Sequence, residues 1–451
     1  MIADRSSDAS EIALDAQWYD RFMAVGSFQD FSLLDGGKDS RDEQKRLFLE
    51  KGTRNPTLDY PKIDLHDLAM RETTLLALKQ EIKDQEPNDE VSKIYRWKIN
   101  VKLAEIAMIQ AAERVDDRVF KAYSHFLYGE PNPEIFTYLI ESLRRETDQY
   151  LQDPDEIIAQ AAQTLNKRLP QEAAEIPSIQ LPSPKIFSQV RNKVLGEVNL
   201  CLLDEVRIED ERDYTPEEIC EIFQSALTSI SAPPEWTVEI DTGSRAGFMI
   251  NQDKKTVVVP QSKNFKGRRL KGILVHEIGT HVAGRITGEN GPLHLLGPGL
   301  DRYEPGEEAL ATMRAQVCND TMTAFSDTDR YLSISLGEGL DGIPRDFRGV
   351  YEFMYDYFYF KALVADNHSE KAATSAQSKA WNTAVRTFRG TSCETPGCCY
   401  TRDLAYAEGN IGLWQSAIKD PAGFEVNNVG RYNLLSDRHT KVLHELGIIE
   451  D

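Results

Sequence analysis

The 451-residue sequence contains no run of eighteen or more apolar residues, few cysteines and a shortage of basic side chains. The missing apolar run excludes a membrane-spanning helix, which needs about 20 such residues. The first residues, MIADRSSDASEIALDAQ, are acidic where a secretory signal would have a basic region and an apolar core. We therefore expect a cytoplasmic protein that has no membrane partner.

The shortage of basic residues argues against nucleic acid as a partner. Lysine and arginine number 52 against 73 acidic residues, a net charge of -21, whereas nucleic-acid binding depends on basic side chains that release counterions. Six cysteines in so long a chain do not make a disulfide framework. Cys393, Cys398 and Cys399 lie close together in CETPGCC, but without the paired C-x-x-C arms of a zinc site we expect reduced thiols. Nothing in the composition indicates an oligomeric state.

The chain is too long for one ordinary domain, and its patterning changes twice. Residues 1–60 are polar and weakly patterned, so we expect a loosely structured leader. Residues 61–180 show apolar positions at three- and four-residue intervals, which predicts a helical region. A proline-marked segment, EIPSIQLPSPKIF, separates this region from residues 181–451, which we expect to form the catalytic domain.

A short β-rich segment opens the second half of the chain. EWTVEIDT and GFMINQDKKTVVVP alternate β-branched residues around a turn, which predicts a small antiparallel sheet. The following segment has an apolar stripe every four residues, at Leu270, Leu274, Ile278 and Val282, and this indicates a helix. The expected fold class is α+β and predominantly helical, with the sheet packed on this helix. The very aromatic YEFMYDYFYFKAL further along is expected to be core.

That helix carries ILVHEIGTHVAGR, with His276 and His281 five positions apart and Glu277 after the first. The zinc-protease signature H-E-x-x-H spaces its histidines by four, so that one helix face presents both. Residues five apart on a regular helix differ by about 140° and point to different faces. Two arrangements would align them: a single π-helical turn, or a distortion at Gly279, which is helix-weakening.

A third metal ligand is expected on the next helix. A catalytic zinc ion takes three protein ligands and keeps one position open. PGEEALATM offers Glu307 and Glu308 in a first turn, and spacing alone does not choose between them.

HEIGTH followed some thirty residues later by GEEALA resembles the tyrosine carboxypeptidase family. This family includes the microtubule-associated tyrosine carboxypeptidases, which trim the C-terminal tyrosine of α-tubulin, and bacterial proteins with a Q-E-G-L-A motif. LYGEPNPEIF, VRTFRGT and YTRDLAYAEGN also resemble it. The resemblance implies a zincin-like HExxxH site that holds one zinc ion per chain through His276, His281 and Glu308, with Glu277 as general base. Ala309 departs from the usual glycine of the motif.

A carboxypeptidase also needs a cation for the substrate's terminal carboxylate, and arginine binds it best through paired hydrogen bonds. We predict Arg389 in this role, with Arg402 and Arg285 as alternatives, and Tyr406 as a donor to the oxyanion. The resulting hypothesis is a zinc metallocarboxypeptidase that removes a C-terminal Tyr or Phe from a peptide or protein. The alternatives are a zinc endopeptidase, and a zinc-binding regulatory or scaffold protein with vestigial peptidase activity. A structural helical protein without metal is the remaining hypothesis.

Overall fold

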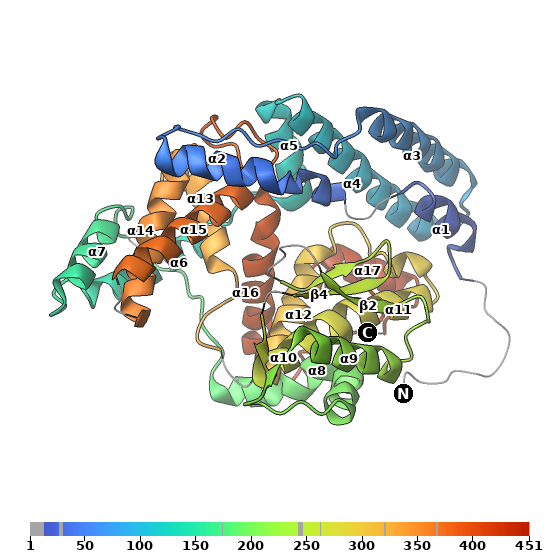
Figure 1. The fold of residues 1–451 in the computed structure, drawn as a ribbon. Helices are drawn as coiled ribbons and strands as arrows, with labels where there is room; N and C mark the ends of the chain where they lie inside the picture. The colour runs from blue at the N-terminus through green and yellow to red at the C-terminus, as the bar shows by residue number, and fades with distance from the viewer. Residues whose placement is uncertain are drawn as a thin grey trace.

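The structure is a computed structural model that describes residues 13–26, 30–173, 175–241, 247–261, 263–319, 322–366 and 369–450. Helices dominate it, as expected, and they form three groups (Figure 1). Helices α2 to α5 lie along the top of the view, α8 to α12 lie at the bottom with the strands, and α6, α7 and α13 to α15 lie on the left. Helix α16 runs between these groups and packs on α12.

The helices between residues 61 and 166 were largely predicted by sequence period, and polar caps fix where several of them begin. Asn132 accepts a hydrogen bond from the Glu134 amide with Pro133 at the first helical position, and Asp64 and Asn88 cap α3 and α4. The helices up to residue 166 are α1 (Ala16–Met23), α2 (Lys38–Glu50), α3 (Leu65–Gln85), α4 (Asp89–Glu113), α5 (Asp117–Tyr128), α6 (Pro133–Asp148) and α7 (Glu156–Asn166).

The prediction of a loosely structured leader does not fit the described part of residues 1–60. Trp18 and Phe22 of α1 are buried, and the Phe48 ring of α2 meets the Trp381 ring at 5.4 Å between centroids. The buried Asp15 accepts hydrogen bonds from the Tyr95 hydroxyl and from two backbone amides at His294 and Leu295. Trp18 and Phe22 are one i, i+4 pair in a polar stretch, which is too short a pattern to predict a packed helix by itself. Residues 1–12 and 27–29 of the predicted leader lie outside the described residues.

The strands form one small mixed sheet and one two-stranded pair. The strands are β1 (Asp213–Tyr214), β2 (Thr237–Asp241), β3 (Met249–Asn251), β4 (Thr256–Pro260) and β5 (Phe265–Lys266). Strands β3 and β4 form the predicted antiparallel hairpin, and β1 pairs antiparallel with β5. Strand β2 instead pairs parallel with β4, because β4 occupies the centre of the order β2-β4-β3 and successive strands alternate in direction.

The sheet packs on the helical segment that carries the histidines, as expected. Val257 and Val259 of β4 share a buried cluster with Leu274, Ile278 and Val282. The helices of this part are α8 (Pro184–Glu205), α9 (Pro216–Ser229), α10 (Gly267–His276), the π-helical turn η2 (Glu277–Val282), α11 (Ala283–Glu289) and α12 (Glu304–Cys318). Burial of this stripe fixes the face that α10 turns to the sheet.

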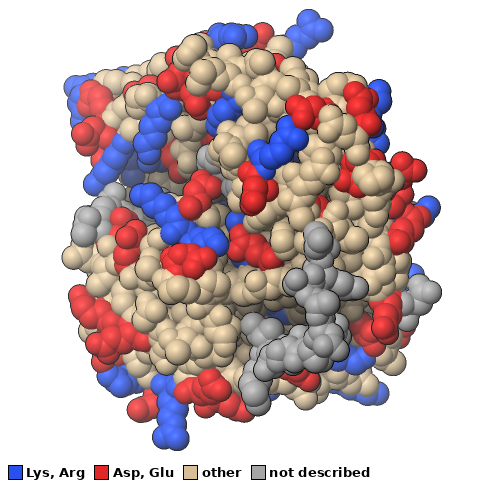
Figure 2. All heavy atoms as spheres, turned by 90° about the vertical axis from the view of Figure 1, so that its right-hand side faces the viewer, with Lys and Arg blue, Asp and Glu red and all other residues tan. Residues whose placement is uncertain are grey.

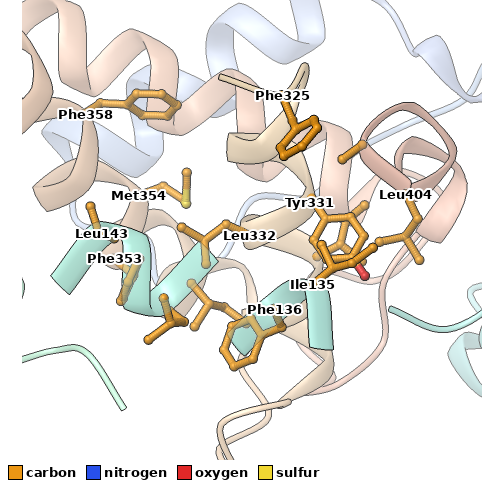
Figure 3. Packing of buried hydrophobic residues seen from close by; sticks show 14 of the residues in the cluster. Ile135, Phe136, Leu143, Phe325, Tyr331, Leu332, Phe353, Met354, Phe358 and Leu404 are labelled. Atoms are coloured by element: carbon orange, nitrogen blue, oxygen red, sulfur yellow. The ribbon is translucent and has the colours of Figure 1, made fainter. Parts of the chain in front are cut away.

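The largest apolar core lies among α6, α13, α14 and α16, and it absorbs the aromatic run as predicted. Phe353, Met354 and Phe358 of α14 belong to one buried cluster with Leu143 of α6 and Leu332 of α13 (Figure 3). The remaining helices are α13 (Thr328–Glu338), α14 (Phe347–Asp366), α15 (Ser369–Phe388), α16 (Leu404–Lys419) and α17 (Asp437–Glu445), with short 3₁₀ segments η1 (Asp30–Asp35), η3 (His294–Leu296) and η4 (Thr401–Asp403). Within the described residues, no helix is long and apolar enough to cross a membrane.

The three clustered cysteines lie in the packed interior. Cys393, Cys398 and Cys399 are buried free thiols. Burial raises the pKa of each thiol above its ordinary value, so all three stay protonated near neutral pH. They belong to the apolar clusters beside α15 and α5.

Candidate active site

The two histidines lie on a π-helical turn, the first of the two arrangements expected for their spacing. Helix α10 ends at His276, and residues Glu277–Val282 form the wider turn before α11 continues the same path. An i→i+5 turn brings residues five apart back to one face. The two imidazole rings accordingly lie next to each other in an edge-to-face arrangement, with centroids 5.0 Å apart.

Side chains from the turn itself, from α8 and from α12 donate hydrogen bonds to backbone oxygens at this turn. The Thr280 hydroxyl donates a hydrogen bond to the Val275 carbonyl at 2.8 Å, so this backbone oxygen beside the turn has a partner. The Gly279 carbonyl accepts from the Asn199 amide at 3.1 Å and from the Arg314 guanidinium at 3.2 Å. Both donors are buried, so these bonds replace contacts that water would otherwise make.

Gly279 is required here for close packing as well as for backbone freedom. A Cβ atom at this position would lie 1.7 Å from Oδ1 of Asn199, on helix α8. The sequence indicated only that glycine weakens a helix. The structure adds that α8 approaches the turn so closely that no side chain fits between them.

The carboxylate that faces both histidines belongs to Glu308. Its Oε2 lies 3.8 Å from Nε2 of His276 and 3.8 Å from Nε2 of His281. The ligand atoms of His276, Glu277 and His281 all lie within 4.8 Å of one another. The fold thus brings together all four residues that the sequence predicted for the centre.

Glu307 faces away from that point, although it is the neighbour of Glu308. Both of its oxygens accept from Arg431, at 2.6 Å and 2.9 Å, and its Oε2 lies 3.3 Å from Nδ1 of His281. The two glutamates therefore approach His281 from opposite sides: Glu308 lies on the Nε2 side and Glu307 lies on the Nδ1 side.

The two carboxylates also differ in their electrostatic surroundings. Burial would raise the pKa of Glu307, but Arg431 and His281 lower it to about 2. Burial raises the pKa of Glu308 despite the opposing effects of His281 and Arg402. Burial lowers the pKa of His276. A partly buried carboxylate between two imidazoles is a site where a divalent cation would offset the desolvation of the charge.

A cavity of about 290 Å³ opens beside Glu308. Its walls come from the end of α5, the start of α12 and the start of α16. The lining residues are His125, Phe126, Leu127, Tyr128, Gly129, Arg302, Glu304, Pro305, Glu308, Arg402, Ala405, Tyr406 and Asn433. Two walls of the cavity thus come from LYGEPNPEIF and YTRDLAYAEGN, the segments in which the sequence resembles the tyrosine carboxypeptidase family.

Of the three arginines that the sequence proposed for the substrate carboxylate, Arg402 lines this cavity, while Arg389 lines another one. Arg389 donates to Asp35 at 2.8 Å and lines a separate cavity of about 100 Å³ formed with η1 and α15. Arg402 lines the cavity beside Glu308, lies 3.7 Å from Glu304 and has a buried Nε without a hydrogen-bond partner among the described residues. Arg389 therefore does not line the cavity beside Glu308, and the role predicted for it from the sequence stays a prediction.

Tyr406 and Arg285, the other two residues predicted to bind substrate, also lie in different places. Tyr406 lines the cavity, and its pKa is raised chiefly by the charge of Glu308 and then by burial. Arg285 is bound to Glu289, at 2.7 Å, one turn further along α11. Sequence reasoning missed Tyr128 and Arg302 in the cavity, and Arg431 and Asn199 around the centre. None of these belongs to a recognisable spacing.

Two histidines and a glutamate that converge beside a cavity form the type of centre that metal-dependent hydrolases use. Residues 183–336 match the model of a family described as microtubule-associated tyrosine carboxypeptidase. The matched segment is about a third of the 451 residues and contains His276, Glu277, His281 and Glu308. A comparison with curated proteins finds no match. Arg402 and Tyr406 lie outside the matched segment.

Proposed function

We propose that the protein is a zinc-dependent carboxypeptidase that removes a C-terminal Tyr or Phe from a peptide or protein. The observation that supports this most directly is the position of Glu308. Its Oε2 lies 3.8 Å from both histidine Nε2 atoms, and the same side chain lines the cavity that contains Arg402. A prospective metal centre and a prospective carboxylate-binding residue therefore share one cavity.

The donor set fits a zinc ion. Bonds of about 2.0–2.2 Å in tetrahedral geometry place ligand atoms roughly 3.3–3.5 Å apart. The distances of 3.8 Å from Glu308 to the histidines need a contraction of only a few tenths of an ångström. Two neutral imidazoles and one carboxylate are the ligands of many catalytic zinc sites, which keep a fourth position open.

When bound, the ion would supply Lewis-acid activation of water and of the scissile carbonyl. The other roles belong to side chains of this chain. Glu277 follows directly after a ligand histidine and would take a proton from the attacking water, then pass it to the leaving amine. The Tyr406 hydroxyl would donate a hydrogen bond to the developing oxyanion.

The cavity favours removal of one terminal residue over cleavage within a chain. Arg402 would bind the free carboxylate through two parallel hydrogen bonds. At about 290 Å³, the cavity is at the lower end of ligand cavities, and it admits one large side chain. Phe126, Leu127 and Tyr128 give it an apolar wall suited to an aromatic ring.

The surface charge is mixed in sign. On the face drawn in Figure 2, lysine and arginine side chains gather around a hollow, with acidic side chains beside them. The net charge of -21 is therefore not spread uniformly. A local basic region can bind an anionic group despite an acidic whole.

The test compares wild type with Glu277→Gln on peptides that end in Tyr or Phe and on the same peptides with an amidated C-terminus. We expect wild type to release the terminal residue only from the free-acid peptides. We expect Glu277→Gln to bind zinc and release at least 100-fold more slowly, since general base catalysis contributes about 10²–10⁴ in rate.

Three other outcomes would change the assignment. Equal release by both proteins would refute the role of Glu277 and the proposed mechanism. Internal cleavage of the amidated peptides would identify an endopeptidase. Zinc binding without any release by wild type would support a regulatory or scaffold role.

A further inference from the structure

Glu307, Arg431 and His281 form a buried chain of contacts that the proposed chemistry does not use. The side chains of Glu307 and Arg431 are each 6% exposed, and two hydrogen bonds of 2.6 Å and 2.9 Å join them. The second oxygen of this carboxylate lies 3.3 Å from Nδ1 of His281. The chain therefore ends on the ring nitrogen opposite the one that approaches Glu308.

Arg431 is fixed in place by its own surroundings. Its backbone amide donates to the Leu296 carbonyl at 2.8 Å, and its carbonyl accepts from the Leu300 amide at 3.0 Å. Its guanidinium lies over the Tyr303 ring, 4.6 Å from the centroid. An arginine held at both its backbone and its head group presents its two donors in one orientation, and this fixes the plane of the Glu307 carboxylate.

We propose that the Glu307–Arg431 pair is a positioning unit for His281: it holds the ring with the proton on Nδ1 and the lone pair of Nε2 turned toward Glu308. This inference rests on the proposed function, because only a metal ligand needs a fixed Nε2 lone pair. A carboxylate on the far ring nitrogen fixes both the tautomer and the orientation of a ligand histidine, and its loss typically weakens metal affinity 10–100-fold.

The same geometry shows why Glu307 is not itself a ligand. Arg431 occupies both of its oxygens, so neither is free to approach Nε2 of the histidines. A side chain at position 284 would also meet this pair: a Cβ atom on Gly284 would lie 3.4 Å from Cγ of Arg431 and 3.8 Å from Oε1 of Glu307. Glu307 and Arg431 thus pack directly against the helix that carries His281.

The test measures Co²⁺ and Zn²⁺ affinity and the visible absorption spectrum of the Co²⁺-loaded protein. The variants are Glu307→Ala, Glu307→Gln and Arg431→Met. We expect Glu307→Ala to weaken both affinities 10–100-fold and to alter the Co²⁺ spectrum. Glu307→Gln should be intermediate, because its amide oxygen can still face Nδ1 of His281 but carries no charge. Arg431→Met should fall between wild type and Glu307→Ala.

The chain offers a matched control in Asp301, another buried carboxylate between a histidine and an arginine. It lies 3.3 Å from Nε2 of His439, and it also accepts a hydrogen bond from Arg438. Asp301→Asn removes the same kind of contact outside the candidate metal centre, so it should leave metal affinity and the Co²⁺ spectrum unchanged. Urea denaturation of every variant monitors folding.

Two results would overturn the inference. Glu307→Ala with wild-type metal affinity and spectrum would show that His281 needs no positioning. Equal losses in Glu307→Ala and Asp301→Asn would show a general effect of stability. Failure of the proposed function would give another result. Wild type and His276→Ala would then bind Co²⁺ equally weakly, whatever residue occupies position 307.

Discussion

Replacing Gly279 by alanine tests how the π-helical turn is held. The new Cβ atom would lie 1.7 Å from Oδ1 and 2.8 Å from Cγ of Asn199. Asn199 is fully buried and donates to the carbonyls of Leu195 at 2.8 Å and Gly279 at 3.1 Å. Its side chain therefore cannot move aside without losing hydrogen bonds.

The expected loss of stability combines opposing contributions. Overpacking of a buried site costs about 1–3 kcal/mol, and each lost hydrogen bond costs about 1 kcal/mol. Alanine favours a helix over glycine by about 1 kcal/mol. We expect Gly279→Ala to lower the free energy of unfolding by about 2 kcal/mol net, whereas a helix position without this neighbour would gain stability.

A double-mutant cycle with Asn199→Ala isolates the collision. The three atoms nearest to the new Cβ all belong to Asn199, so removing that side chain should remove the penalty. We expect Asn199→Ala to cost about 1–2 kcal/mol through its lost hydrogen bonds. The double variant should be at least as stable as Asn199→Ala alone. The measurement is the midpoint and slope of urea denaturation for the four proteins.

The result that would refute this reasoning is a Gly279→Ala variant as stable as wild type. Additive losses in the double variant would show instead that Asn199 is not the obstacle. Zinc affinity provides a second readout, since a turn that relaxes to a regular helix would separate His276 from His281. The double variant should recover the affinity that Gly279→Ala loses.

Two further predictions concern the cavity and a buried lysine. Arg402→Met should raise KM for peptides with a free C-terminus roughly 10–100-fold, which is the effect of losing a charge-assisted hydrogen bond. Arg389→Met, in its separate cavity, should leave steady-state kinetics unchanged. The reverse pattern would identify Arg389 as the residue that binds the substrate carboxylate. Burial lowers the pKa of Lys98 to about 7, so between pH 7 and 10 the unfolded chain binds more protons than the folded one and wild-type stability rises with pH. Lys98→Met should therefore be most stabilising relative to wild type near pH 7. The difference in free energy of unfolding between the two proteins should shrink by about 1 kcal/mol per pH unit toward pH 10. A difference that stays constant with pH in urea denaturation would contradict this.

Local patterns in the sequence were enough to predict the wider turn at the histidines and the buried face of their helix. The spacing of His276 and His281 conflicts with a regular helix, and that conflict itself predicts a wider turn. The apolar stripe from Leu270 to Val282 predicts which face meets the sheet, and the structure buries it there. These predictions succeed because their interactions lie within a few residues of each other along the chain.

The same local reasoning failed wherever a role depended on distant segments. The leader is polar and weakly patterned, yet its Trp18 and Phe22 are buried. Arg389 and Arg402 look equivalent in the sequence, but Arg389 is bound to Asp35, which lies hundreds of residues earlier in the chain. No spacing along the chain contains that information.

The sequence by itself determined that two histidines, a following glutamate and a pair of later glutamates were available at a helix behind a sheet. The tertiary structure decided which glutamate faces the Nε2 atoms, because Arg431 reaches Glu307 and leaves Glu308 turned toward the histidines. It also decided where the cavity lies, since α5, α12 and α16 meet there from three distant parts of the chain. Side-chain direction in a packed interior depends on neighbours in space, and these are set only when the whole chain has folded.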